Sequence, residues 1–243
     1  MGHHSDRDGL RGNLYAVDVP ALIDALNDHV WPEDALQLMG EAVLVVACER
    51  ANGVGPAGRR CAVALRDRGW EGDDELADQI DAALGVGPAQ SLKSLAVDLE
   101  ELAGILEGDP VMGGGRIDLR TGEVWPQSAI EYFEEVGELD PDDDEDDDGR
   151  WLDVDCEGSR APYRDMEIFI DMITDDRIAD RLSRAIHGRG AFRRFKDTLA
   201  GWPDLMTRWY GFSDERHRGR ARTWLAGQGY TPAPPTPERA DGP

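Results

Sequence analysis

The sequence predicts an α+β protein, in which an N-terminal helical bundle is followed by a small antiparallel sheet packed with C-terminal helices. Two observations support this fold class. Apolar residues recur at helical spacing through the first hundred residues and again near the C-terminus, whereas they alternate with polar residues over short stretches in the middle. A chain of 243 residues is also long enough for one large domain or two small ones, each with its own core.

The predicted organisation has four parts. In chain order they are a disordered lead at 1–16, a helical domain at 17–108, an α+β domain at 113–230 with an acidic insertion at 138–148, and a disordered tail at 231–243. Five short helices are expected in the helical domain. Pro20 and Pro32 each open a helix, because proline is favoured in the first turn. Two later helices end at Gly69 and Gly85, and leucines at spacings of three and four predict another over Leu92–Leu106.

The second domain begins where the spacing of apolar residues changes from a helical pattern to strict alternation. Glycines 113–115 form a linker between the two domains. After it, Ile117 and Leu119 alternate with charged residues, and Thr121-Gly122 supplies a turn. This pattern predicts a β-hairpin. Alternation resumes over Trp151–Glu157, which is the expected third strand.

Nine of the eleven residues from Glu138 to Asp148 are acidic, and like charges at that density indicate a solvated loop or an interaction segment. Four helices are expected to follow the third strand. Their predicted inward residues include Met166, Phe169, Ile170, Leu182, Ile186, Phe192, Phe195, Leu199, Trp209 and Leu225.

Charge is distributed very unevenly along the chain. The net charge is −24, but residues 181–230 hold 11 Lys/Arg against 4 Asp/Glu and therefore carry +7. Residues 1–180 carry −30, from 14 basic and 44 acidic residues. The overall charge argues against attraction of the whole surface to nucleic acid or anionic lipid, whereas the local reversal predicts a basic C-terminal face.

Several classes of protein are disfavoured. Cys48, Cys61 and Cys156 are odd in number and lie outside any Cys-x-x-Cys pattern, so they predict neither a zinc site nor a disulfide framework. The longest apolar run, Ala42–Cys48, is far shorter than the roughly 20 residues of a membrane span. We therefore expect a cytoplasmic protein with no cofactor, no bound metal and no membrane partner.

The start of one predicted helix is a candidate anion-binding site. The segment His-Gly-Arg-Gly-Ala-Phe-Arg-Arg-Phe-Lys-Asp at 187–197 places two glycines and several cations beside free helix amides. Arginine guanidinium groups can grip a phosphate in a bidentate manner. The candidate residues are Gly188, Arg189, Gly190, Arg193 and Arg194. The alternative is that Arg193 pairs with Asp197 four residues later, on a solvated helix face.

Two further interpretations remain open. The acidic segment 138–148 would act as a polyanion that masks the basic face of its own chain, which would make the protein a protein–protein interaction module. Alternatively, Asp153, Asp155 and Glu157 would hold a divalent metal in a hydrolase. Carboxylates at alternate positions of a strand more often form its solvent-exposed face than a metal site. The sequence therefore favours a binding or regulatory module over an enzyme. Its anionic partner would be nucleic acid or an acidic protein.

The C-terminal half also resembles a known family. The matching residues are Tyr163-x-x-Met166-Glu167-x-Phe169-Ile170, the string Gly190-Ala-Phe-Arg-Arg-Phe-Lys-Asp197, Trp209-Tyr210-x-Phe212 and Trp224-Leu225. Over roughly residues 113–230 these make the chain similar to the bacterial uncharacterised protein family 0158. The resemblance implies no particular activity, and the helical front end and the acidic insertion look like additions to the shared core.

Overall fold

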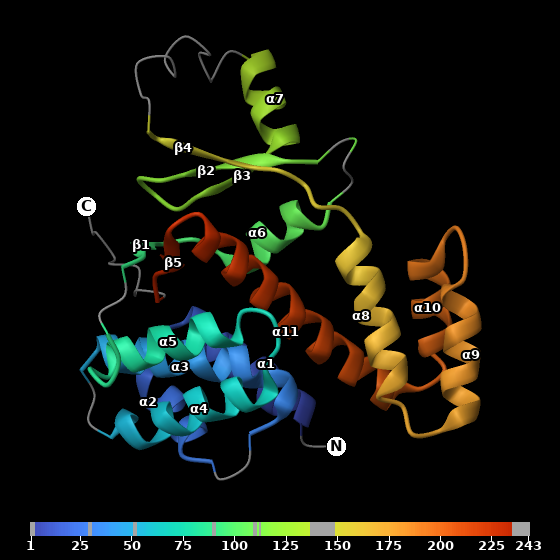
Figure 1. Ribbon diagram of the computed structural model, residues 1–243, viewed down its shortest axis with the longest axis horizontal. Coiled ribbons are helices and arrows are strands. Elements are labelled where there is room, and N and C mark those ends of the chain that lie inside the picture. Colours follow the sequence, from blue (N-terminus) through green and yellow to red (C-terminus); the bar gives the residue numbers. More distant parts are fainter. Residues whose placement is uncertain are drawn as a thin grey trace. The chain divides into compact units, whose positions relative to one another are not determined.

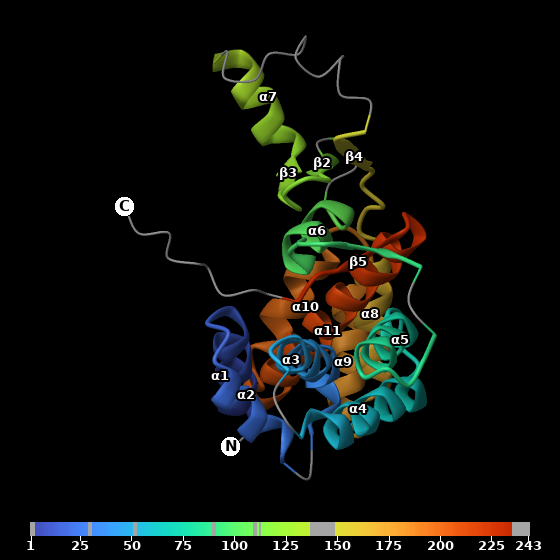
Figure 2. The same ribbon diagram turned by 90° about the vertical axis from the view of Figure 1, so that its left-hand side faces the viewer.

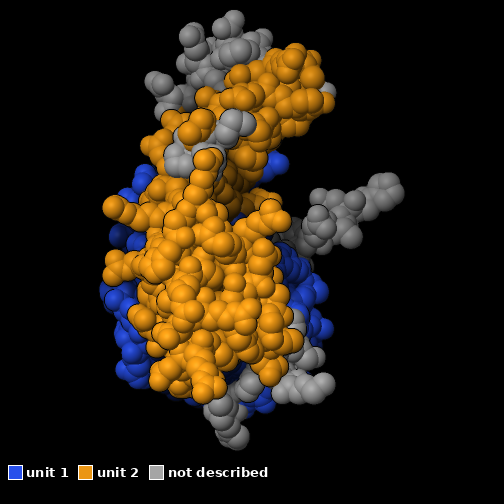
Figure 3. All heavy atoms as spheres, turned by 90° about the vertical axis from the view of Figure 1, so that its right-hand side faces the viewer, with its two compact units in different colours: residues 1–100, 120–123, 217–243 blue, residues 101–119, 124–216 orange. Residues whose placement is uncertain are grey.

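The computed structural model describes residues 3–28, 31–50, 53–88, 91–108, 111, 113–136 and 149–234. The chain divides into two compact units, coloured separately in Figure 3. Unit 1 comprises residues 1–100, 120–123 and 217–243, and unit 2 comprises residues 101–119 and 124–216. Helices dominate both units, and unit 2 also holds an antiparallel sheet (Figure 1), so the predicted α+β class is confirmed. The acidic segment 138–148 lies outside the described residues.

Unit 1 is a helical bundle built around one buried helix. Its helices are α1 (His3–Tyr15), α2 (Val19–Leu26), the short 3-10 helix η1 (Glu33–Ala35), α3 (Leu36–Cys48), α4 (Val54–Arg68) and α5 (Asp73–Ala83). Most residues of α3 are buried, because it packs against α1, α2, α4 and α5 (Figure 2). A parallel strand pair, β1 (Lys93–Leu95) and β5 (Tyr230–Pro232), brings the C-terminal end of the chain into this unit.

The structure differs from the sequence prediction at three places in unit 1. The predicted disordered tail at 231–243 begins too early, because residues 231–232 belong to β5, which pairs with β1. Residues 1–16 were expected to be a disordered lead, yet residues 3–15 form α1, with Leu10 and Leu14 buried in the core. Two leucines at i, i+4 are a weak periodic signal, and such a short helix is stabilised mainly by its packing. The helix predicted over Leu92–Leu106 is shorter, because β1 takes its first part and α6 spans only Leu99–Leu106. The partner that makes β1 a strand lies far away in the sequence, so local periodicity could not reveal it.

The sheet of unit 2 has the predicted hairpin and third strand. Strands β2 (Gly115–Asp118), β3 (Val124–Pro126) and β4 (Trp151–Val154) form an antiparallel sheet in the order β3-β2-β4. Helix α7 (Gln127–Val136) packs on β2 and β3, with the rings of Trp125 and Phe133 centred 5.4 Å apart. The third strand ends at Val154, three residues earlier than predicted.

The four C-terminal helices form where they were expected. They are α8 (Arg160–Asp171), α9 (Asp176–Ile186), α10 (Ala191–Leu199) and α11 (Pro203–Gly227). Phe169, Phe195 and Trp209 pack edge to face at the centre of this group, with ring centroids 4.7 to 6.4 Å apart. Such ring pairs add about 0.5–1.5 kcal/mol each beyond the area they bury. Helix α11 contributes its residues up to Arg216 to unit 2 and its residues from His217 onward to unit 1.

The second part of α11 is held in unit 1 by a buried guanidinium group. The Arg222 side chain is almost fully buried and donates from Nε to Gln37 Oε1 at 3.1 Å. It also donates to Gln79 Oε1 at 3.0 Å and to Glu41 Oε1 at 3.1 Å. All three nitrogens of this guanidinium group therefore have an oxygen acceptor, as a buried charge requires.

The acceptors of Arg222 are themselves held in place. Gln37 Nε2 donates to the buried Asp73 at 2.9 Å, and Gln79 Nε2 donates to the Pro232 carbonyl at 2.7 Å. The close approach of α11 to the residues before α5 also depends on Gly219, because a Cβ at that position would collide with the backbone of Glu71. Residues 217–232 are thereby joined to α3 and α5 by hydrogen bonds and by packing.

The predicted boundary between a helical domain at 17–108 and an α+β domain at 113–230 remains a prediction. The two compact units describe how residues are packed, and packing alone does not test which segment folds by itself.

Replacement of Arg222 by alanine should destabilise the protein strongly. The variant leaves Glu41, Gln37 and Gln79 with fewer donors in a buried place, so we expect the free energy of unfolding to fall by about 3–5 kcal/mol. Urea unfolding followed by circular dichroism measures this change. The exposed Arg59 on α4 provides the control, since Arg59→Ala should stay within about 0.5 kcal/mol of the wild type. A decrease of less than about 1 kcal/mol in Arg222→Ala would show that the network is not essential.

Candidate anion-binding surface

The basic C-terminal segment separates into a buried part and an exposed part. In α11, Arg216 Nε pairs with the buried Asp165 at 3.0 Å, Arg218 pairs with Glu41 at 2.9 Å, and Arg222 lies in the network already described. Arg220 is buried as well. These four arginines contribute to the sequence charge of +7 but do not present their charge to a partner at the surface.

Apart from Arg208 on α11, the exposed cations of this region lie on α9, on α10 and on the loop between them. They are Arg177, Arg181, Arg184, Arg189, Arg193, Arg194 and Lys196. Three acidic residues, Asp176, Asp180 and Asp197, lie among them. We call these residues together the α9–α10 surface. Its apolar side faces inward, where Leu182, Ile186, Phe195 and Leu199 are buried.

Two glycines form the turn between α9 and α10. Gly188 has φ of +79° and Gly190 has φ of +81°, in the left-handed region that side chains with a Cβ rarely adopt. Gly190 caps the start of α10 and, having no side chain, supplies no capping hydrogen bond. The first amides of α10 therefore receive no hydrogen bond from a capping side chain, and uncapped helix amides are donors that suit an anion.

The neighbouring arginines Arg193 and Arg194 have different surroundings. The Arg194 guanidinium group donates to the carbonyl oxygens of Ala185 at 3.0 Å, His187 at 2.6 Å and Gly188 at 3.2 Å, and also to that of Arg189. The Ala185 carbonyl belongs to the last turn of α9, which a helix leaves unpaired, and the other three carbonyl groups belong to the turn that follows. Arg193 projects into solvent and lies 3.7 Å from Asp197, an exposed pair of small energetic value.

The five predicted anion-binding residues are thus adjacent in space, with distinct functions in the turn. Gly188 and Gly190 shape the backbone, and Arg194 holds that shape through four carbonyl groups. Arg189 and Arg193 are exposed, so their guanidinium groups are the ones in position to meet an anion.

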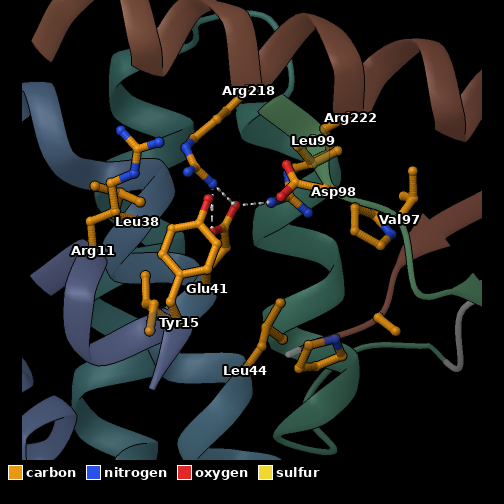
Figure 4. A pocket seen from close by; sticks show the side chains of 14 residues that line it. Arg11, Tyr15, Leu38, Glu41, Leu44, Val97, Asp98, Leu99, Arg218 and Arg222 are labelled. Carbon is orange, nitrogen blue, oxygen red and sulfur yellow. Dashed lines mark hydrogen bonds and ion pairs between the residues drawn. The ribbon is translucent and has the colours of Figure 1, made fainter. Parts of the chain in front are cut away.

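Unit 1 contains a separate pocket of about 90 Å³, which the sequence did not reveal (Figure 4). Glu41 lies at its centre between Arg218 and Arg222, and Tyr15 forms one side. Burial, followed by the nearby Asp98 and Glu100 carboxylates, raises the pKa of the Tyr15 hydroxyl. The hydroxyl is therefore neutral at physiological pH.

The charged groups of this pocket pair with each other. Glu41 receives hydrogen bonds from Arg218 and Arg222, and Glu100 pairs with Arg11 and Arg218. A clue to this arrangement is present in the sequence, because Arg218 and Arg222 share a helix face with Leu225, which was expected to face inward. Basic residues on an apolar stripe indicate buried ion pairs.

The carboxylates considered as metal ligands do not converge. Asp153, Asp155 and Glu157 are exposed, and the Asp153 carboxylate lies 3.5 Å from Arg116 Nε in an exposed ion pair. Across the residues that the structure describes, no group of three or more histidine, cysteine, aspartate or glutamate side chains is placed to hold a metal ion. The geometry gives the hydrolase hypothesis no support.

The comparisons with known proteins match the C-terminal half of the chain. The model of the family described as "Uncharacterised protein family (UPF0158)" matches residues 117–235. The C-terminal half of this chain belongs to that family. A relative named UPF0158 protein PA5073, from Pseudomonas aeruginosa, is 27% identical over 142 residues, which cover 58% of this chain and 89% of the relative.

The matched region of the UPF0158 family contains the β2–β3 hairpin, the strand β4 and all four C-terminal helices. The α9–α10 surface therefore lies in the shared part of the chain, whereas most of the helical bundle of unit 1 precedes it. Neither the family description nor the name of the relative states an activity. No solved structure matches the chain. No helix in the described ranges is long and apolar enough to cross a membrane.

Arg194→Ala should loosen the turn between α9 and α10, whereas Arg193→Ala should not. The first variant leaves four carbonyl groups without their donor, so we expect stability to fall by about 1–2 kcal/mol and amide exchange around residues 185–195 to become faster. The exposed Arg193 should change stability by less than about 0.5 kcal/mol. Hydrogen exchange measured by mass spectrometry distinguishes the two, and equal protection in both variants would contradict a structural function for Arg194.

Proposed function

We propose that this chain is a non-enzymatic binding or regulatory protein that engages an anionic partner through the α9–α10 surface. The observation that carries the proposal is the local excess of exposed positive charge. Residues 176–199 hold seven Lys/Arg and three Asp/Glu, a net +4 within a chain of net −24. All seven of these cationic side chains are exposed.

The chemistry of the surface favours oxyanions. Six of its seven cations are arginines, whose planar guanidinium groups match the geometry of phosphate and carboxylate groups. The ion pairs that Arg184 and Arg193 make with Asp180 and Asp197 are exposed and as long as 3.8 and 3.7 Å. Such pairs are worth less than about 1 kcal/mol, so an incoming anion would displace them at little cost.

The start of α10, which no side chain caps, is adjacent to Arg189 and Arg193 in the chain. The positive end of the helix dipole and the guanidinium groups of Arg189 and Arg193 would then act on one anion together. Because Arg194 fixes the turn before any ligand arrives, the amides would not need to be ordered on binding.

Binding of nucleic acid tests one class of partner. We expect affinity for mixed tRNA or a short DNA duplex to fall steeply with salt, since each arginine that meets a phosphate releases counterions. The double variant Arg189→Ala/Arg193→Ala should weaken binding and reduce the salt slope by about 2, roughly one for each arginine replaced. Fluorescence anisotropy at low and moderate salt measures both quantities.

The control for this experiment has the same change of charge at another place. Arg50 and Arg59 are exposed in unit 1, so Arg50→Ala/Arg59→Ala should leave the affinity and the slope nearly unchanged if the α9–α10 surface is responsible. Deletion of residues 138–148 tests the masking hypothesis, which predicts tighter binding. Absence of binding to nucleic acid, to polyglutamate and to another copy of this acidic chain, even after this deletion, would refute an anionic partner.

A further inference from the structure

The outward face of α7 is acidic and partly apolar. Ile130 is buried, and the Phe133 ring packs against Trp125, so this side of the helix faces the sheet. The opposite side presents Glu131, Tyr132 and Glu135 to solvent, and Tyr132 is 58% exposed. Val136 follows Tyr132 at i+4 and is 49% exposed. Tyr132 and Val136 are therefore neighbours on the helix surface and form one exposed apolar strip beside the carboxylates.

The charge of this face is opposite to that of the α9–α10 surface. Helix α7 contains three glutamates and no lysine or arginine, whereas residues 176–199 carry +4. The spacing of the acidic residues on α7 also matches that of the basic residues on α9. Glu131 and Glu135 are four residues apart, as are Arg177 and Arg181. Both pairs therefore extend about 6 Å along their helix axes, so two ion pairs could form at once.

Within one copy the two faces lie apart. In the part of unit 2 that the structure describes, α7 packs on β2 and β3, whereas α9 packs on α8 and α10. Figures 1 and 2 show α7 beyond the sheet, on the side away from α9 and α10. The two faces of one molecule thus remain accessible to other molecules.

We infer that the α7 face of one copy docks on the α9–α10 surface of another copy of this chain. The inference rests on the proposed function, because it identifies the anionic partner of that surface as this protein itself. Tyr132 would lie against an arginine, a favourable cation–π contact, while Glu131 and Glu135 pair with Arg177 and Arg181. Arginine and tyrosine are also the residue types that contribute most to binding at interfaces.

The high net charge does not prevent this association. At physiological ionic strength the screening length is about 8 Å, so repulsion between the remaining acidic surfaces is reduced while ion pairs in contact keep their attraction. Complementary charges that face each other also fix the partner and its orientation, since a wrong pairing places like charges together.

A charge-swap experiment tests the inference with the full chain. We expect sedimentation velocity at physiological salt to show a weight-average mass that rises with concentration for the wild type. Glu131→Arg/Glu135→Arg and Arg177→Glu/Arg181→Glu should each weaken self-association at least tenfold, because each places like charges opposite each other. An equimolar mixture of the two variants should associate again, since the reversed charges are complementary.

The control Arg50→Glu/Arg59→Glu makes the same change of net charge in unit 1 as the arginine swap and should associate like the wild type. Thermal unfolding checks that each variant folds. A wild type that remains monomeric, or a mixture that fails to associate, would overturn the inference. If the wild type is monomeric but binds nucleic acid with the salt dependence described above, the proposed function stands and the partner is nucleic acid. If neither occurs and polyglutamate is not bound either, both fail.

Discussion

The guanidinium group of Arg222 is surrounded by oxygen acceptors from three side chains, and the packing of unit 1 depends on this contact. Gln37 and Glu41 belong to α3, and Gln79 belongs to α5, so one buried cation joins α11 to both helices. Gln79 also reaches the Pro232 carbonyl, which ties the end of the chain to the same group. A buried charge is tolerated only when such partners are complete, and this requirement makes the arrangement specific.

Arginine has two different functions in the C-terminal half of this protein. At Arg216, Arg218 and Arg222 of α11 it is a structural cation whose partners are the protein's own carboxylates and amides. On α9 and α10 it is a surface cation with weak partners, apart from Arg194, which closes the turn between the helices. The difference lies in what each helix face contacts, since the residue type is the same.

Periodic patterns were sufficient to predict most of the helices and strands. The hairpin, the third strand and the four C-terminal helices all follow from apolar residues repeated at regular spacing, and their inward residues are largely the ones expected. Prediction failed for β1, for its partner β5 and for α1. The strand β1 exists because β5 pairs with it, and α1 is ordered by packing of Leu10 and Leu14, so neither depends on a local signal.

The sequence by itself determined the fold class, the family of the C-terminal half and the existence of a basic segment, because periodicity, motif residues and charge are properties of the chain order. Only the tertiary structure decided which of the basic residues are exposed. Arg218 and Arg222 are as basic as Arg189 and Arg193, yet the first pair is buried among carboxylates and amides while the second faces solvent. That distinction depends on residues more than a hundred positions away, such as Gln37 and Glu41, which folding brings to α11.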